Sequence, residues 1–336
     1  MAAIIYSEGS GVADSMFGKS QEPIKALIEQ NVEAFQEFSA LDKIFNMDTT
    51  KNYAEKYTSE TSLGDFEDVG ENGAYPRTGF QEGFSKVIEP TTWKSSFEVT
   101  QEMVEDAKIG KIRSRANAFS LSYNRTREKF GAALLGGATG SVVKFGKGGE
   151  YSTTSADGVP LFSAGHGSAT DKKAAKQSNL FSGAFSMDTL CRVQEAMQKF
   201  TDDDGNLLNV APGTIIIPNN GLLKKEVFAA VGSDLDPESN NNAVNFQAGL
   251  WNVIVWNYLP GAIGGKPYFM LLDAEYRDAY ECLPWLDRVK LTVRSDIDPN
   301  TDANVWKGRA RFGAGFNNWR CIALCGEGVT GGTVFS

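Results

Sequence analysis

The chain has 336 residues, of which 41% are hydrophobic and 22% are charged, and its formal net charge is −9. This composition is typical of a globular protein with room for two or more domains, and no apolar run reaches the ~18 residues of a membrane span. The acidic balance argues against a dedicated nucleic-acid binder, although it does not exclude a protein that encloses nucleic acid.

The N-terminus and the cysteines indicate the compartment. The first residues have no basic region and too short an apolar core for a secretory signal. The four cysteines are few for this length. Together these features predict reduced thiols in a cytoplasm.

The N-terminal part of the chain is expected to form an arm, a helix and a hairpin. Residues 1–20 are small and polar and resemble an arm. Pro23 opens an amphipathic helix whose apolar face begins at Ile24 and Ile28. The stretch from about Phe45 to Phe97 is interrupted by glycines and returns through a run rich in Phe, Val, Thr and Trp. It predicts a long two-stranded hairpin that has too few apolar residues for a core of its own.

The next element is the longest in the chain. Thr100 to Gly136 predicts a single helix of about 35 residues, with Thr100 as N-cap and acidic residues in its first turns. An apolar stripe recurs along it at helical spacing: Met103, Ala107, Ala116, Phe119, Tyr123, Phe130 and Leu134. Because this stripe is thin and rich in alanine, the helix is expected to lie along a surface.

The rest of the chain alternates helices and strands. Residues 141–149 are expected to form a loop, and Ser186 to cap a second helix. Beyond this helix we expect strands at 214–218, 250–259 and 268–273, with a helix at 221–231. Antiparallel strands are expected at 289–295 and 305–324.

No catalytic, cofactor or metal site is predicted. The only histidine, His166, cannot build a multi-histidine centre and is expected to make a structural hydrogen bond in a loop. The acidic run 202–206 departs from the calcium-loop pattern, and 140–147 departs from the phosphate-loop pattern. Cys321 and Cys325 lie four residues apart in an expected strand, too far for a disulfide, and are interpreted as core thiols.

The charge pattern is the informative surface feature. Residues 60–71 contain five acids and no Lys or Arg, namely Glu60, Asp65, Glu67, Asp68 and Glu71. The long helix carries basic residues that are candidates for an inter-subunit contact, namely Lys108, Lys111, Arg113, Arg115, Arg125 and Arg127. The two sets could pair within one subunit, pair between subunits, or remain as two solvated faces. Gly110, expected inside the helix at a cost of ~1 kcal/mol against alanine, is a candidate hinge.

The order of these elements resembles the major capsid proteins of tailed phages, which have the Hong Kong 97-type fold. The segment from Trp93 to Glu102, continuing into the long helix, is similar to the Mu-like branch of head subunits, and so is the turn from Asp157 to Ser163 followed by His166. The resemblance covers about residues 20–325. It implies an α+β fold and a shell-forming protein without catalysis.

The resemblance also implies a domain division and partners. The implied parts are an N-terminal arm (1–50), an E-loop (51–97), a peripheral domain built on a spine helix at 100–136 (98–205), an axial domain (206–290) and return strands (291–336). Its expected partners are further copies of itself in pentamers and hexamers, with separate scaffold, portal and decoration proteins. The icosahedral shell would be assembled in the bacterial cytoplasm and would enclose double-stranded DNA without reading its sequence.

Two rival functions remain at this point. One is an encapsulin-like nanocompartment of the same fold, which would hold a protein cargo instead of DNA. The other is a soluble α/β enzyme, which the single histidine and the missing catalytic motifs disfavour. Some relatives crosslink neighbours through a lysine, and Lys86 lies in the expected hairpin, but no partner for it can be identified.

Overall fold

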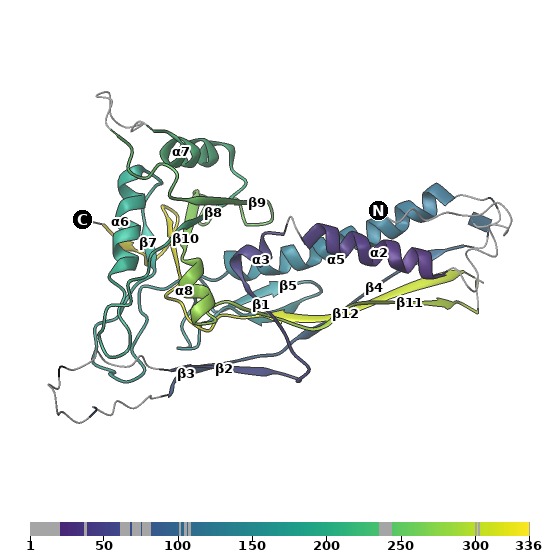
Figure 1. The fold of residues 1–336 in the computed structure, drawn as a ribbon, viewed down its shortest axis with the longest axis horizontal. Coiled ribbons are helices and arrows are strands. Elements are labelled where there is room, and N and C mark those ends of the chain that lie inside the picture. The colour runs from purple at the N-terminus through teal and green to yellow at the C-terminus, as the bar shows by residue number, and fades with distance from the viewer. Residues whose placement is uncertain are drawn as a thin grey trace.

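The computed structural model consists of two parts (Figure 1). One is a long helix that lies along a twisted sheet, and the other is a mixed α/β lobe at one end of that sheet. The structure describes residues 21–335 except 37–38, 61–67, 69–74, 76–81, 101, 104–105, 107–108, 235–243, 300 and 302. The expected arm at 1–20 therefore lies outside the described residues.

The elongated part of the molecule is built on a four-stranded sheet in the order β1-β11-β12-β4. This part is called the arm from here on and is distinct from the N-terminal arm expected at 1–50. Its strands are β1 (Asn46–Thr49), β4 (Thr91–Val99), β11 (Pro284–Ile297) and β12 (Asn304–Ala314). β1 is parallel to β11, and the other pairs are antiparallel. Helix α5 (Ile109–Gly136) covers one face of this sheet, and α2 (Gln21–Gln36) lies beside α5 (Figure 1).

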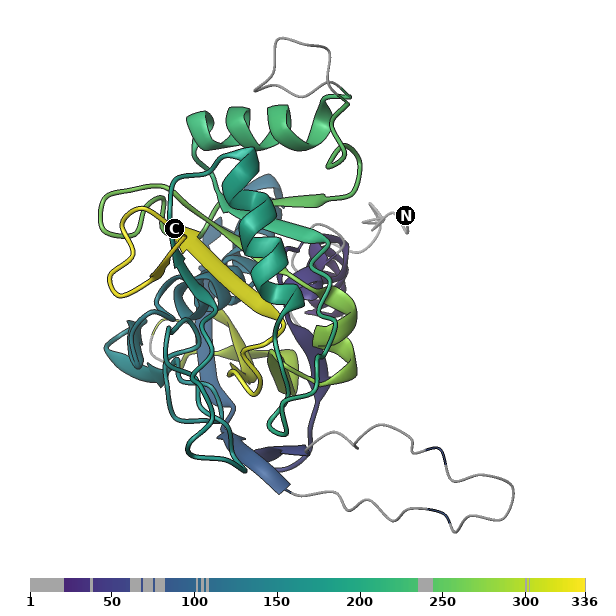
Figure 2. The same ribbon diagram turned by 90° about the vertical axis from the view of Figure 1, so that its left-hand side faces the viewer.

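The lobe is built on a six-stranded sheet in the order β14-β7-β13-β10-β8-β9. Its strands are β7 (Leu180–Ser182), β8 (Thr214–Pro218), β9 (Asn252–Trp256), β10 (Tyr268–Leu272), β13 (Ile322–Gly326) and β14 (Thr333–Val334). β8, β10 and β13 are buried along their whole length, as expected for apolar runs in the middle of a sheet. Helices α6 (Met187–Gln198) and α7 (Gly221–Gly232) lie at this end of the molecule, and α8 (Ala274–Ala279) lies toward the arm (Figures 1 and 2).

Several predicted elements are confirmed. β8 has the predicted bounds, and the hydroxyl of Ser186 caps α6 by accepting a hydrogen bond from the Thr189 amide. The apolar stripe of the long helix is buried at Ala116, Phe119 and Phe130.

The predicted start of the long helix is wrong. Glu102 is helical, but Asp106 lies in a turn and α5 begins at Ile109. Two physical reasons explain the difference. Glu102 and Asp106 are like charges four residues apart, and Gly110 is a weak helix former. The C-terminal half of α5 is also more deeply buried than a surface helix, with Ala132, Leu134 and Leu135 inaccessible to solvent.

The predicted hairpin also differs from the structure. Its outgoing strand β2 (Glu55–Glu60) pairs with β3 (Glu82–Ile88), but the return run then breaks at Pro90. Proline has no amide hydrogen and cannot continue the ladder. The remainder of the run forms β4 and pairs with β12 in the arm.

Two further expectations are corrected. The loop expected at 141–149 contains a small hairpin of β5 (Val142–Phe145) and β6 (Gly149–Ser152), whose turn uses glycines with positive φ. The strand expected at 305–324 is two strands in different sheets, β12 and β13, because the chain turns after Ala314. The short helix α3 (Leu41–Ile44) precedes β1.

The contact between α5 and β12 depends on a glycine. A Cβ built at Gly308 would collide with the ring of Phe119 and approach Leu291. Phe119 is itself buried in the apolar cluster between α2, α5 and the sheet.

We therefore expect Gly308→Ala to destabilise the unassembled chain by about 1–3 kcal/mol, through overpacking. Gly213→Ala is the matched control, because a Cβ there meets nothing within 4 Å, and it should change stability by no more than about 0.5 kcal/mol. Urea unfolding of the two variants measures the difference. Equal stabilities would show that α5 does not require this close approach.

Candidate functional site

The basic residues of α5 are divided between its exposed back and the protein core. The exposed members are Lys111, Arg113, Arg115 and Arg125, whereas Lys108 lies outside the described residues. The Arg115 guanidinium donates a hydrogen bond to the Glu98 carbonyl. Lys111, Arg115 and Arg125 lie on one side of the helix, whereas Arg113 lies on the opposite side. The three residues on one side are available to an acidic partner.

Arg127 is not available to a partner, which corrects its place among the candidates. Its guanidinium makes an ion pair with Asp287 at 2.9 Å, and its side chain is 9% exposed. It also stacks over the Trp285 ring, 5.2 Å from the centroid. The periodicity of the sequence did not separate Arg127 from its exposed neighbours, because an arginine stem packs against apolar surface as readily as it extends into water.

Glu128 is a structural residue that the sequence did not identify. One carboxylate oxygen accepts hydrogen bonds from the Ser39 hydroxyl (2.6 Å) and the Ala40 amide (3.1 Å). The other accepts one from the Trp256 indole at 2.6 Å. Glu128 thus joins α5 to the segment before α3 and to β9 in the lobe. The one available signal was its position as the single acid in the basic half of the helix.

Gly110 is the second residue of α5, so the expectation that it lies in the helix interior is wrong. A Cβ there would meet nothing within 4 Å. Packing therefore does not require glycine at this position.

The acidic run begins on the hairpin and continues outside the described residues. Glu60 ends β2 and Asp68 is exposed, while Asp65, Glu67 and Glu71 are not described. β2 and β3 leave the body at the end that is away from the N-terminal half of α5 (Figure 1). This arrangement favours a pairing between subunits over a pairing within one subunit.

The hairpin has little burial of its own. Within β2 and the described residues of β3, Ile88 is the buried apolar side chain, and Val87 is 54% exposed. Lys86 fixes the base of the hairpin, because its ammonium donates to the hydroxyls of Ser152 (2.9 Å) and Thr154 (2.7 Å). Burial lowers the pKa of Lys86, against the opposing effect of Asp157.

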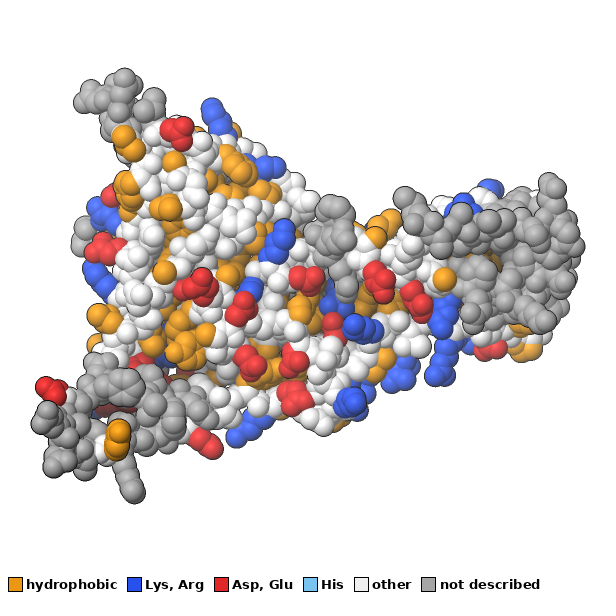
Figure 3. All heavy atoms as spheres, viewed as in Figure 1, with side chains coloured by type: hydrophobic (Ala, Val, Ile, Leu, Met, Phe, Trp, Pro, Cys, Tyr) orange, Lys and Arg blue, Asp and Glu red, His pale blue; other side chains and the backbone are white. Residues whose placement is uncertain are grey.

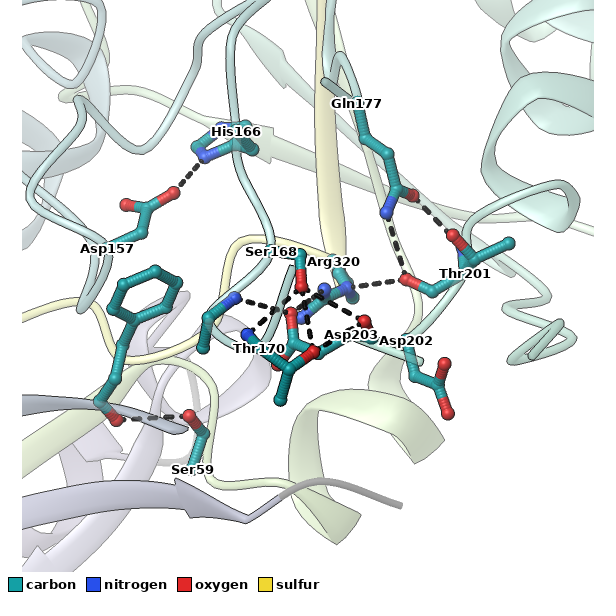
Figure 4. Close-up of polar contacts among 12 residues, drawn as sticks. Ser59, Asp157, His166, Ser168, Thr170, Gln177, Thr201, Asp202, Asp203 and Arg320 are labelled. Carbon is teal, nitrogen blue, oxygen red and sulfur yellow. Dashed lines mark hydrogen bonds and ion pairs between the residues drawn. The ribbon is translucent and has the colours of Figure 1, made fainter. Parts of the chain in front are cut away.

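His166 makes the structural hydrogen bonds that the sequence predicted. Its side chain is fully buried, and Nδ1 lies 2.6 Å from an Asp157 oxygen (Figure 4). Nε2 lies 3.2 Å from the Asn179 side-chain oxygen, whose orientation is fixed because the amide nitrogen of Asn179 donates to the carbonyls of Leu161 and Ile322. Both ring nitrogens therefore lie within hydrogen-bonding distance of side-chain oxygens.

Asp157 is the charged partner in this buried pair. Burial opposes its ionisation, but hydrogen bonds from His166, Ser155 and the Val159 amide outweigh burial and lower the pKa of the Asp157 carboxyl. The ring of Trp319 stacks on His166 with centroids 4.2 Å apart. The pair thus fixes the turn after β6 to the loop before β13.

The acidic run 202–206 is a turn, as expected. One oxygen of Asp202 accepts hydrogen bonds from the amides of Asp204 and Asn206. Asp203 makes a mostly buried ion pair with Arg320 at 3.1 Å (Figure 4). In the part of the chain that the structure describes, no group of three potential ligands has metal-binding geometry.

The four cysteines are free thiols, and three of them are buried. Cys321 and Cys325 are both inaccessible to solvent, which confirms their interpretation as core residues. Among the described residues, no helix is long and apolar enough to cross a membrane.

Exposed charge is unevenly distributed over the surface. On the face shown in Figure 3, acidic side chains gather around β1 and α8, and basic side chains follow the lower edge of the arm toward its distal end. The molecule therefore presents opposite charges at separate places.

Comparisons with known proteins identify the family. A model of the family described as phage capsid protein matches residues 83–324, well over half of the chain. No curated protein sequence matches.

Solved structures share the fold at low sequence identity. A structure from Mycobacterium phage Patience has a TM-score of 0.52 at 13% identity and covers 96% of this chain and 94% of its own. A virus-like particle from Pyrococcus furiosus gives a TM-score of 0.48 at 11% identity, with 90% of this chain and 98% of that chain covered. The capsid of an empty GTA particle gives a TM-score of 0.47 at 12% identity, with 86% of this chain and 89% of that chain covered. Of these three structures, only the one from Mycobacterium phage Patience has a TM-score above 0.5, and this similarity supports the fold alone.

The buried Asp157–His166 pair has a testable dependence on pH. The folded-state pKa of Asp157 is lowered, so its contribution to stability is present above the unfolded pKa of about 4 and is lost as the pH falls through the folded value. We expect Asp157→Asn to destabilise the unassembled chain by about 3 kcal/mol at pH 7, and the difference from wild type to shrink below about pH 4.

The control is Asp188→Asn, which removes an exposed ion pair with Arg192 and should cost no more than about 1 kcal/mol. Urea unfolding at a series of pH values measures both variants. If Asp157→Asn loses no more stability than Asp188→Asn, the buried Asp157–His166 pair does not stabilise the fold.

Proposed function

The chain belongs to the phage capsid protein family, and from this premise we propose that many copies of it assemble into an icosahedral shell around packaged double-stranded DNA. Its α+β fold is of the Hong Kong 97 capsid type, and its role is structural rather than catalytic. As a capsid protein it is part of the virion.

The observation that supports self-assembly most directly is the hairpin. β2 and β3 form a separate two-stranded sheet, in which Ile88 is the one fully buried side chain among the described residues and the others are half-buried or exposed. Isolated hairpins of this kind are marginally stable in water. A neighbouring subunit would supply the missing contacts, and a shell repeats such contacts over many copies.

We further propose pentamers and hexamers as the units of the shell, a separate scaffold with portal and decoration proteins, and assembly in the bacterial cytoplasm. The similarity of residues 93–102 and 157–163 to the Mu-like head subunits supports placing the chain in that branch. A solved shell whose hairpin and arm contacts differ from those of Mu-like heads would contradict this placement.

Sheet membership supports a revision of the proposed domains. β1 and β4 share a sheet with β11 and β12, so we assign them to the peripheral domain, although they were expected in the N-terminal arm and the E-loop. β7, β13 and β14 share a sheet with β8–β10, so we assign them to the axial domain. The E-loop then reduces to the β2–β3 hairpin with its tip.

Gly110 is retained as a proposed hinge at the start of the spine helix, now at its first turn. Alanine fits there without collision, so a failure of Gly110→Ala shells to mature would reflect backbone freedom rather than packing. Electron microscopy of matured particles distinguishes the outcomes, and normal maturation would remove the proposal.

The function is tested by the assembly state of the purified wild-type chain. We expect particles of uniform size by size-exclusion chromatography and electron microscopy, formed alone or with the phage scaffold. A chain that stays near its monomer mass of 36.5 kDa under all assembly conditions would contradict a shell protein. Uniform shells that exclude DNA when the phage packaging proteins are present would contradict DNA enclosure.

The acidic hairpin is proposed to contact the exposed basic residues of α5 on a neighbouring subunit. We expect Glu67→Lys, Asp68→Lys and Glu71→Lys together to lower particle yield about tenfold or more, because like charges placed against each other oppose docking. The unassembled variant should keep its thermal stability. The matched control reverses three acids elsewhere, at Glu29, Glu33 and Glu226, and normal yield from the hairpin variant would exclude this contact.

A further inference from the structure

A groove runs between β2 and the body of the subunit. Two adjoining cavities of about 780 and 670 Å³ open there and share Asp48, Tyr57, Asp278 and Glu281 in their walls. β1, β2 and the end of α8 form the sides of this groove. The lining also includes Lys56 and Lys290, and three arginines that are paired with carboxylates, Arg127, Arg277 and Arg320. Acids outnumber bases among the lining residues.

Some carboxylates of the groove are neutralised within the subunit and others are not. Asp278 is paired with Arg277, and Asp203 with Arg320. Asp48, Glu55 and Glu281 have no ion pair with a basic side chain in the described parts of the chain. Hydrogen bonds from Thr50 and Asn52 lower the pKa of Glu55, which keeps it ionised.

Tyr57 lies where these carboxylates converge. Burial raises the pKa of its phenol, and the charges of Asp48, Glu281 and Glu55 raise it further. Glu281 also has a φ of +43°, a backbone conformation that residues other than glycine rarely adopt. Three carboxylates therefore surround the Tyr57 phenol in this groove.

A matching basic surface lies on the outer face of the arm. Trp306, Gly308 and Ala310 of β12 face α5 and are buried, so the alternate residues Lys307 and Arg309 point away from the helix into solvent. They stand in register with Arg294 of β11 and Lys94 of β4, respectively.

This basic strip, consisting of Lys94, Arg294, Lys307 and Arg309, is electrostatically unfavourable in a single subunit. Lys94 lies directly opposite Arg309, and Arg294 directly opposite Lys307. Like charges at such cross-strand positions destabilise a sheet. Asp296 offsets only part of this repulsion between basic side chains, through an exposed ion pair with Lys307 at 2.9 Å.

The strip and the groove of one subunit cannot meet. The groove residue Asp48 is paired with Leu286 of β11, and Arg294 lies eight residues farther along that strand, which corresponds to about 26 Å of extended strand. The groove-lining residue of β11 nearest to the strip is itself basic, Lys290. The complementary surface must therefore come from another molecule, and further copies of this chain carry it.

We propose that the acidic groove of one subunit receives the basic strip of a neighbouring subunit. The contact joins two different surfaces, so it is heterologous and can propagate around a closed shell. It places basic side chains that face each other across strands against carboxylates that have no ion pair within the described parts of their own subunit. This inference rests on the proposed shell function and assigns one of its interfaces.

The test reverses each side separately and then both together. Asp48→Lys with Glu281→Lys should lower the particle yield about tenfold or more, and so should Arg294→Glu with Arg309→Glu. The chain that carries all four changes restores opposite charges across the contact and has the wild-type net charge. We expect its yield to recover to within about twofold of wild type.

Sedimentation and electron microscopy measure the yield, and thermal unfolding of the unassembled chains confirms that each variant is folded. Wild-type yield from either double variant would overturn the proposal, and so would a folded fourfold variant that does not recover. If the wild-type chain itself forms no particles, the shell function fails instead.

Discussion

The burial of one face of α5 is the constraint on which the other parts of the structure depend. The helix packs against the four-stranded sheet through Phe119 and Gly308, where a Cβ on the strand would collide with the phenylalanine ring. Farther along, the Arg127–Asp287 pair holds it to β11, and Glu128 holds it to the segment before α3 and to β9. Because the same helix contacts both sheets, it sets the position of the lobe relative to the arm. Buried ionic groups of this kind fix geometry more reliably than they add stability.

The surface shows the opposite situation, in which local requirements are left unmet. The β2–β3 hairpin has one fully buried side chain among its described residues, three carboxylates surround Tyr57 in the groove, and basic side chains face each other across three strands of the arm. An isolated protein would gain stability by removing each of these features. If neighbours bind these surfaces as proposed, the stability of the subunit is coupled to the formation of the shell.

Sequence reasoning worked where one physical effect dominated. The continuous apolar runs of β8 and β10 and the Ser186 cap identified their elements because burial and capping act locally. It failed where two effects competed. The start of α5 depended on two like charges and a glycine, which opposed an otherwise helical pattern. Pro90 divided the return run of the expected hairpin into β3 and β4, although the composition of that run is uniform. Arg127 and Glu128 could not be separated from surface residues, since their partners lie in distant segments of the chain.

The break at Pro90 has a mechanical consequence. The hairpin is joined to the arm by the short segments on either side of it and by the Lys86 contacts, not by a continuous ladder of hydrogen bonds. The Tyr57 hydroxyl also contacts Asp48 of β1, and Ile88 is buried, so the hairpin is attached by side-chain contacts. A closed surface contains places where neighbours meet at different angles. We expect the β2–β3 hairpin, which shares no sheet with the rest of the subunit, to be the part that differs most between those places.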